Sequence, residues 1–191
     1  MKADKAAYRP AARVVLVAAC ILLLPLVAMQ VTDEVRWDLA DFAVAGALLV
    51  GTGLLYELAA RRAGTVVYRA AVGAALAAAL LLIWVNLAVG IIGEPDEPAN
   101  VMYLGVPAVG IIGAIIARLR PQGVARALVA TALAQALVTV IVLVRGLGAP
   151  ATGPLEVVAL NGFFIALFVG SAWLFRLAAR AHLPEGAAPK D

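Results

Sequence analysis

Five uncharged polar side chains interrupt long apolar stretches of the sequence, and they are the residues best placed to bind a solute. Thr131, Gln135 and Thr139 follow one another at intervals of four residues, so they lie on one face of a helix. Asn86 and Asn161 each lie inside a separate apolar stretch. Amides and hydroxyls exchange hydrogen bonds without carrying charge. We expect these residues to form an uncharged hydrogen-bonding seam, which we call the polar seam.

The polar seam has two interpretations. In the first, its groups bond between helices, which stabilises membrane proteins by about 0.6 kcal/mol per pair on average. In the second, they line a path or pocket for a small polar or cationic solute, because polar residues at membrane depth often mark such sites. A water-accessible cavity bordered by Asn86, Gln135 and Asn161 would favour the second interpretation. If these residues instead lie in separate helix contacts that exclude water, the second interpretation has no support.

Acidic residues gather in two connecting segments that we expect on one side of a membrane. Asp38 and Asp41 open one apolar run, while Glu94, Asp96 and Glu97 occupy the segment EPDEPAN. Together they would form an acidic outer mouth that could attract cations. The simpler interpretation of the first two is helix capping, because carboxylates favour helix N-termini.

Signatures of enzymes and cofactor proteins are absent from the sequence. Glu57 and Arg61 stand four residues apart, as in the Glu-x-x-x-Arg element of an intramembrane glutamic protease, but a local ion pair explains them better. The apolar runs contain no histidine, so we expect no haem and no zinc site. No phosphate-binding loop occurs, and Ser171 has no histidine partner. We therefore expect no catalytic residue, cofactor or metal.

The composition favours a membrane environment. Hydrophobic residues make up 64% of the 191 residues, charged residues only 14%, and the mean hydropathy is +1.01. Soluble domains are about half apolar and a quarter charged. The net charge of +3 is small and its basic residues are scattered, so we expect no nucleic-acid partner. The expected partners are the lipid bilayer and either further copies of the chain or a larger membrane complex.

Six apolar runs are long enough to cross a bilayer as helices. We therefore predict an all-α fold, a single transmembrane domain built as a bundle of six transmembrane helices with short loops. Asn86 would lie about 10 Å inside the end of the third run. Residues 179–191 are rich in Pro, Gly and Ala, and we expect a disordered tail. The predicted spans are 12–31, 39–60, 66–93, 101–118, 124–145 and 155–178.

The basic residues predict how the chain threads through the membrane. Every Lys and Arg except Arg36 and Arg145 falls in the termini or in alternate loops, on one predicted side. The positive-inside rule places that side, with both termini, in the cytoplasm. The ends of the spans carry aromatic residues, which are typical interfacial anchors: Tyr56, Tyr68, Tyr103 and Trp173.

The string AVGIIG occurs twice, at Ala88–Gly93 and Ala108–Gly113. We expect the first copy to close the third span and the second to lie inside the fourth. Glycines three residues apart leave a notch in which a neighbouring helix packs, and Gly162, Ala166 and Gly170 form a similar small-residue face. An inverted duplication is the alternative explanation of the repeat. Prolines stop the helix between the copies, and Asn100 or an acid would cap the next one.

Two segments resemble a group of small, uncharacterised bacterial inner-membrane proteins. They are WDLADFAVAGALLVGTGLLYELAARR and WVNLAVGIIGEPDEPANVMYLGVPAVGIIGAIIARLRP. The resemblance implies a bacterial cytoplasmic membrane and no particular activity.

The function we expect is that of a non-enzymatic integral membrane protein, structural or accessory, that packs with itself or with a larger complex. The alternative is a transporter or channel for a small polar or cationic solute that passes along the polar seam. An intramembrane enzyme is the third class, and the residues give it the least support.

Overall fold

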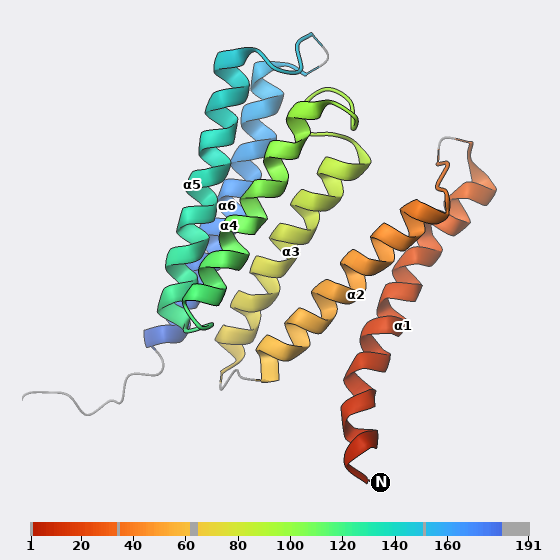
Figure 1. The fold of residues 1–191 in the computed structure, drawn as a ribbon, viewed down its shortest axis with the longest axis vertical. Coiled ribbons are helices and arrows are strands. Elements are labelled where there is room, and N and C mark those ends of the chain that lie inside the picture. Colours follow the sequence, from red (N-terminus) through yellow and green to blue (C-terminus); the bar gives the residue numbers. More distant parts are fainter. Residues whose placement is uncertain (1, 34, 62–64, 151, 181–191) are drawn as a thin grey trace, which may run out of the picture. The chain divides into compact units, whose positions relative to one another are not determined.

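A computed structural model describes residues 2–33, 35–61, 65–150 and 152–180, with side chains from Pro10 onward. In these ranges helices joined by short connections make up the chain, and six helices are long and apolar enough to cross a membrane (Figure 1). The predicted all-α class with six membrane-crossing helices is confirmed. The elements are α1 (Lys2–Val31), α2 (Leu39–Arg61), α3 (Val66–Ala88), the 3₁₀ helix η1 (Pro98–Val101), α4 (Met102–Ile116), α5 (Pro121–Arg145) and α6 (Pro154–Arg180).

The third helix ends earlier than the sequence analysis predicts. It ends at Ala88, not at residue 93, and Val89 and Gly90 both donate their backbone N–H to Val85 O. Gly90 has a φ of +78°, the left-handed conformation that favours glycine just after a helix end. The apolar run continues past this glycine as a buried loop, which is why hydropathy alone overextends the span.

The C-terminal helix is longer than predicted, because α6 continues to Arg180. Residues 181–191, the rest of the predicted tail, lie outside the described residues.

The chain divides into two compact units, Met1–Arg61 and Arg62–Asp191, where the sequence analysis predicts one domain. The first unit is an antiparallel hairpin of α1 and α2. Glycines on α2 let the two helices approach: a Cβ on Gly53 would lie 2.5 Å from Val14 Cγ1, and one on Gly46 would lie 3.5 Å from Leu22 Cδ1. Small residues at such crossings are typical of packing in membranes.

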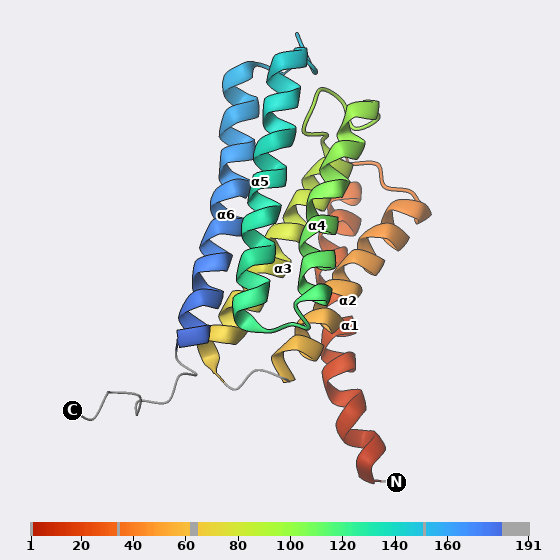
Figure 2. The same cartoon turned by 60° about the vertical axis from the view of Figure 1, so that its left-hand side comes forward.

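The second unit is a four-helix bundle of α3 to α6 (Figures 1 and 2). Helix α5 packs between α4 and α6, and α6 packs between α5 and α3. Glycines of α4 lie against α5: a Cβ on Gly113 would lie 2.6 Å from Ala127 Cβ, and one on Gly110 would lie 2.8 Å from Thr131 Oγ1. The predicted packing role of the second AVGIIG copy is therefore observed.

Aromatic side chains fill the interior of this bundle. Tyr68 and Phe175 meet edge to face with ring centroids 5.3 Å apart, and the Tyr68 hydroxyl donates to Leu119 O at 3.0 Å. Tyr68 and Tyr103 are buried, so their side chains are core groups and not the lipid-facing anchors that we predicted. Trp173 and Tyr56 are exposed, as anchors would be.

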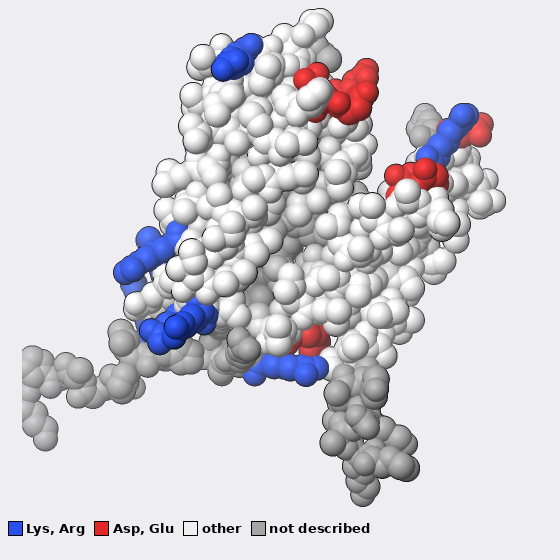
Figure 3. Space-filling view, in the orientation of Figure 1, with Lys and Arg blue, Asp and Glu red and all other residues white. Residues whose placement is uncertain are grey.

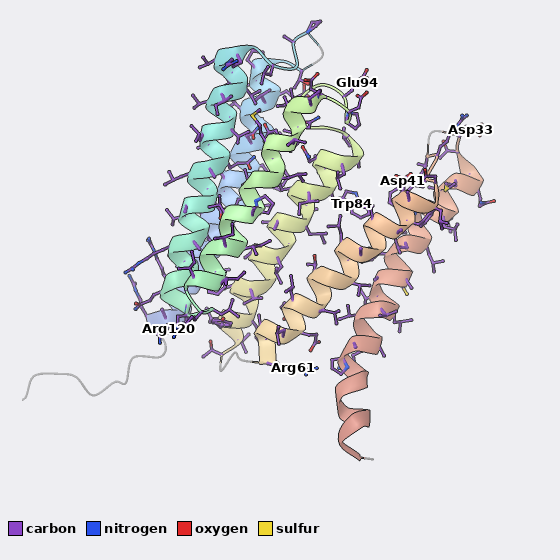
Figure 4. The ribbon with its side chains drawn as sticks, viewed as in Figure 1. Asp33, Asp41, Arg61, Trp84, Glu94 and Arg120 are labelled. Carbon is purple, nitrogen blue, oxygen red and sulfur yellow. The ribbon has the colours of Figure 1, made fainter. Side chains whose placement is uncertain are left out.

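Most acidic residues lie at one end of each unit and most basic residues at the other (Figures 3 and 4). The exceptions are Arg36 beside Asp33, Glu57 beside Arg61, and Arg145 at the end of α5 opposite Arg120. In the bundle, Glu94 lies at one end and Arg120 at the other; in the hairpin, Asp33 and Asp41 lie opposite Arg61. This separation matches the predicted alternation of acidic and basic loops. Which end faces the cytoplasm stays a prediction.

Candidate functional site

The centre of the polar seam is a direct hydrogen bond between two helices. Gln135 Nε2 on α5 donates to Asn161 Oδ1 on α6 at 2.7 Å, and both side chains are fully buried. Asn161 Nδ2 in turn donates to Val157 O, one turn earlier in α6, at 2.8 Å. The structure therefore joins two of the five predicted residues as an interhelical contact, which is the first of the two interpretations.

This network fixes the orientation of both amides. Val157 O is an acceptor, so it must face the Asn161 NH₂ group, and Asn161 must turn its Oδ1 toward Gln135. Gln135 must then present its NH₂ group to Asn161 and its Oε1 elsewhere. Gln135 Oε1 is buried and has no hydrogen-bond partner. The centre of the polar seam thus contains a hydrogen-bond acceptor without a partner.

Tyr103 on α4 is a member of this cluster that the sequence analysis missed. Its side chain is fully buried, and its hydroxyl interacts with the Asn161 side chain. The contact lacks hydrogen-bond geometry, however, and Tyr103 Oη has no partner that meets it. The spacing of the buried residues Tyr103, Val106 and Pro107 along α4 is the helical signal that could have revealed the residue.

Asn86 on α3 lies close to the same level of the bundle. Tyr68 contacts Phe175, and α3 and α6 run antiparallel, so Asn86 is level with Val157 and about 6 Å along the axis from Asn161. Asn86 is 3% exposed, and its Oδ1 has no partner. Because α3 ends at Ala88, the residue is in the last turn of its helix, and the predicted depth of about 10 Å is wrong.

The two threonines of the seam do not bond to other helices. Thr131 Oγ1 donates to Ala127 O at 2.9 Å, and Thr139 Oγ1 donates to Gln135 O at 2.8 Å. Such bonds to the carbonyl four residues earlier satisfy a hydroxyl within its own helix. Thr131 is buried beneath Gly110 of α4, whereas Thr139 is half-buried. Among the described residues of the α5 stripe, Gln135 is the one that bonds across the bundle.

The first two acids of the predicted mouth cap α2. Asp38 N donates to Asp41 Oδ2 and Asp41 N donates to Asp38 Oδ1, both at 2.9 Å. This reciprocal pair satisfies two N–H groups at the helix start. The capping interpretation of Asp38 and Asp41 is confirmed.

The remaining acids of the predicted mouth belong to the other unit. Glu94, Asp96 and Glu97 are exposed in the connection between α3 and η1. Because the two acidic sets lie in different units, a mouth built from both stays a prediction. The Glu57–Arg61 ion pair on α2 is present at 4.0 Å.

Asn100 holds the connection between α3 and α4 and does not cap a helix. Its Oδ1 accepts from the backbone N–H groups of Ile91 and Ile92 at 3.1 and 3.0 Å. Its Nδ2 donates to Ile92 O and Glu94 O at 3.2 and 2.8 Å. The prediction of an N-cap at Asn100 or an acid is wrong, because Glu97 before η1 and Val101 before α4 form no side-chain cap bond.

A second side chain ties this connection to the start of α6. Gly93 N donates to Thr152 Oγ1 at 2.9 Å, and Gly93 and Gly148 lie close together. Ile91 and Ile92, which belong to the connection, are buried. The connection between α3 and α4 is therefore tied both to Asn100 and to Thr152.

The chemistry available at this site is hydrogen bonding without charge. Among the described residues, no three His, Cys, Asp or Glu side chains are grouped to hold a metal ion. Comparisons with protein-family models, curated proteins and solved structures found no match. The buried polar side chains of the bundle are thus the basis for a functional argument: Tyr103, Gln135 and Asn161 together, and Asn86 at the end of α3.

Proposed function

We propose that the chain is a non-enzymatic protein of the bacterial cytoplasmic membrane, with both termini in the cytoplasm, that acts by packing with itself or with a larger membrane complex. The observation that carries the proposal is the buried bond between Gln135 and Asn161. A solute path needs polar groups that face an opening, whereas these two amides face each other between α5 and α6 with no exposed surface. Their bond packs α5 against α6 within one chain, which supports a structural role over a solute path.

The outward face of α6 supports association with a partner. Gly162, Ala166 and Gly170 are exposed at intervals of four residues, and a Cβ on either glycine would meet nothing within 4 Å. We predicted that these residues pack against a neighbouring helix, but none in the bundle covers them. Small residues at this spacing allow a second helix to approach closely in a bilayer.

Cysteine crosslinking in membranes tests self-association. Cys20 is the sole cysteine of the sequence and would first be replaced, Cys20→Ser. Ala166→Cys on α6 should then form a disulfide-linked dimer under mild oxidation. Leu133→Cys on α5 is the matched control, because Leu133 is exposed and lies within about 5 Å of the same depth. Equal crosslinking at the two positions would contradict an α6 interface.

Bulky substitutions sharpen this test. Gly162→Leu and Gly170→Leu should abolish the dimer without affecting the fold of the monomer, because both positions face open space. Size analysis in mild detergent gives the stoichiometry. A monomer at every concentration, together with no crosslink, would overturn self-association and leave a larger complex as the remaining form of the proposal.

A transporter of a small polar solute is the second candidate. Three buried oxygens without partners favour it: Asn86 Oδ1, Tyr103 Oη and Gln135 Oε1. Asn86→Leu and Gln135→Leu should leave the chain folded, while uptake of a transported solute into proteoliposomes would be lost. Equal uptake by the wild type, both variants and empty liposomes across a solute screen would contradict transport.

A further inference from the structure

The exposed face of α6 changes in character beyond Gly170. The residues that follow on the same side are Trp173, Arg176 and Arg180, because steps of three or four residues stay on one side of a helix. All three are exposed, Trp173 at 59%. The small-residue face, which carries the proposed self-association, therefore ends in an aromatic ring and two cations.

Trp173 indicates where this end of α6 lies in the bilayer. Exposed tryptophans of membrane helices gather at the level of the lipid headgroups. At 1.5 Å per residue, Arg176 lies about 4.5 Å and Arg180 about 10.5 Å beyond Trp173 along the axis. Arginine side chains near a helix end extend toward the same level. Both guanidinium groups are thus placed among the phosphates of the lipids.

The two arginines have no counter-charge in the described part of the bundle. Neither forms an ion pair with a described residue. On α6 itself, the acid Glu156 is about 30 Å from Arg176 along the axis. The other described acids of the bundle lie in the connection after α3, at the opposite end from Arg120 (Figure 4): Glu94, Asp96 and Glu97.

Further arginines add positive charge at the same end of the bundle. The Tyr68 hydroxyl bonds to Leu119 O and its ring contacts Phe175. The start of α3, the α4–α5 turn and the last turns of α6 therefore lie at one level. Exposed arginines occur in all three elements and in the second turn of α5: Arg69, Arg118, Arg120, Arg126, Arg176 and Arg180.

Self-association through the small-residue face would bring two such charged ends together. Copies that thread in the same direction place their α6 helices parallel, with Arg176 about 15 Å along the axis from Ala166. At crossing angles of roughly 20–40°, the two axes at that level are only about 5–10 Å farther apart than at the crossing point. Like charges that meet across an interface are disfavoured. An anion between the arginines of the two copies would remove this repulsion.

We propose that an anionic phospholipid binds between the α6 helices of two copies, with its phosphate held by Arg176 and Arg180 of both. The inference rests on the self-association form of the proposed function and names the lipid class that this interface requires. Guanidinium groups donate paired hydrogen bonds to phosphate oxygens. Basic pockets between membrane helices bind anionic headgroups. A free phosphate ion offers the same oxygens, but the lipid phosphate is anchored at the depth of these arginines.

Crosslinking in liposomes of defined composition tests the proposal. The full chain would carry Ala166→Cys in the Cys20→Ser background. Phosphatidylcholine has a headgroup without net charge, whereas phosphatidylglycerol has an anionic one. The dimer fraction should rise several-fold when part of the phosphatidylcholine is replaced by phosphatidylglycerol.

Variants without the two charges assign the effect to α6. Arg176→Gln combined with Arg180→Gln removes both the repulsion and the phosphate ligands, so its dimer fraction should be the same in the two lipids. Arg126→Gln is the matched control, because Arg126 is an exposed arginine of the same end but lies on α5. It should keep the wild-type response. Circular dichroism verifies that each variant is folded.

Native mass spectrometry of the purified full chain measures the lipid directly. Dimers extracted from the mixed liposomes should retain phosphatidylglycerol, and the double variant should retain several-fold less. Equal retention by the wild type and the double variant would contradict a site at these arginines.

The crosslinking outcomes separate the lipid from self-association. A wild-type dimer fraction that is equal in both lipids would overturn the lipid proposal and leave self-association intact. No dimer in either lipid would refute self-association, and the lipid proposal with it. A rise produced by sodium phosphate in phosphatidylcholine liposomes would also overturn the lipid proposal, because the ligand would then be a free anion.

Discussion

The two copies of AVGIIG have the same six residues but differ in secondary structure. Ala88–Gly93 ends α3 and continues as an irregular connection, whereas Ala108–Gly113 is regular helix in α4. The isoleucines of the two copies also differ in their exposure. Ile91 and Ile92 are 2% and 0% exposed, while the corresponding Ile111 and Ile112 are more than half exposed.

The difference lies in what surrounds each copy. Gly90 and Gly93 take positive φ angles of 78° and 59°, and Asn100 satisfies the backbone of the two isoleucines. In the second copy, Gly110 and Gly113 are helical and give α5 room to approach. The same glycine therefore serves as a turn residue in one copy and as a contact surface in the other.

The largest effect should come from removing the side chain that holds the first copy. Asn100→Leu leaves two backbone N–H groups and the carbonyl of Ile92 unpaired, and should lower the free energy of unfolding by about 4 kcal/mol or more. Glu94 O loses one of its two donors and keeps the N–H of Glu97. Titration with a denaturing detergent measures the loss. Asn100→Asp keeps an acceptor and should lose roughly half as much. A change below about 1 kcal/mol for Asn100→Leu would show that contacts other than those of Asn100 stabilise the connection.

The two isoleucine positions should differ strongly in sensitivity. Ile92→Ala opens a cavity in the core and should cost about 3.5 kcal/mol. Ile112→Ala changes an exposed side chain and should cost less than about 0.5 kcal/mol. Thermal unfolding followed by circular dichroism compares the two. Similar losses would mean that the burial of the two copies does not differ in the membrane.

The third position of the repeat should be more sensitive in the first copy. Gly90→Ala forces a side chain into the left-handed region and against backbone atoms of Glu94 at 2.7 Å, so it should cost about 2.5 kcal/mol. Gly110→Ala meets only the Thr131 side chain and gains helix propensity, so its cost should be about 1 kcal/mol. Unfolding curves recorded in parallel decide the order, and a larger loss at Gly110 would refute it.

At the sixth position of the repeat, substitution should destabilise the second copy more than the first. The difference between the two copies should be smaller than at the third position. Gly113→Ala would push α4 away from Ala127, with Cβ atoms 2.6 Å apart, and should cost about 2 kcal/mol. Gly93→Ala meets nothing closer than 3.8 Å, so only its positive φ remains, at about 1 kcal/mol. Protease susceptibility of the connection between α3 and α4 provides an independent measure. A Gly93 variant less stable than the Gly113 variant would contradict this predicted order.

Hydropathy was sufficient to locate the six helices, since a run of apolar residues needs no tertiary information to be recognised. It failed at Ala88 because a buried connection and a membrane helix have the same composition. The repeat shows the limit directly: no local pattern distinguishes two identical strings, and the distinction comes from Asn100 and from the neighbouring helix.

The polar residues were found from the sequence, but their partners were not. Helical spacing placed Gln135 on a face with Thr131 and Thr139, yet it could not show that Gln135 alone would meet Asn161. Tyr103 was missed because a tyrosine near a helix end is typical of a lipid-facing anchor as well as of a core. Asp38 and Asp41, whose bonds span three residues, were interpreted correctly because those bonds are local.

The bond between Gly93 and Thr152 has a consequence for biosynthesis. Its two partners are 59 residues apart, so the ribosome has to complete α4 and α5 before the connection after α3 can reach its final form. The cap of α2, by contrast, is available as soon as Asp41 leaves the ribosomal tunnel. The hairpin can thus be finished while the bundle still waits in the translocon for its last helix.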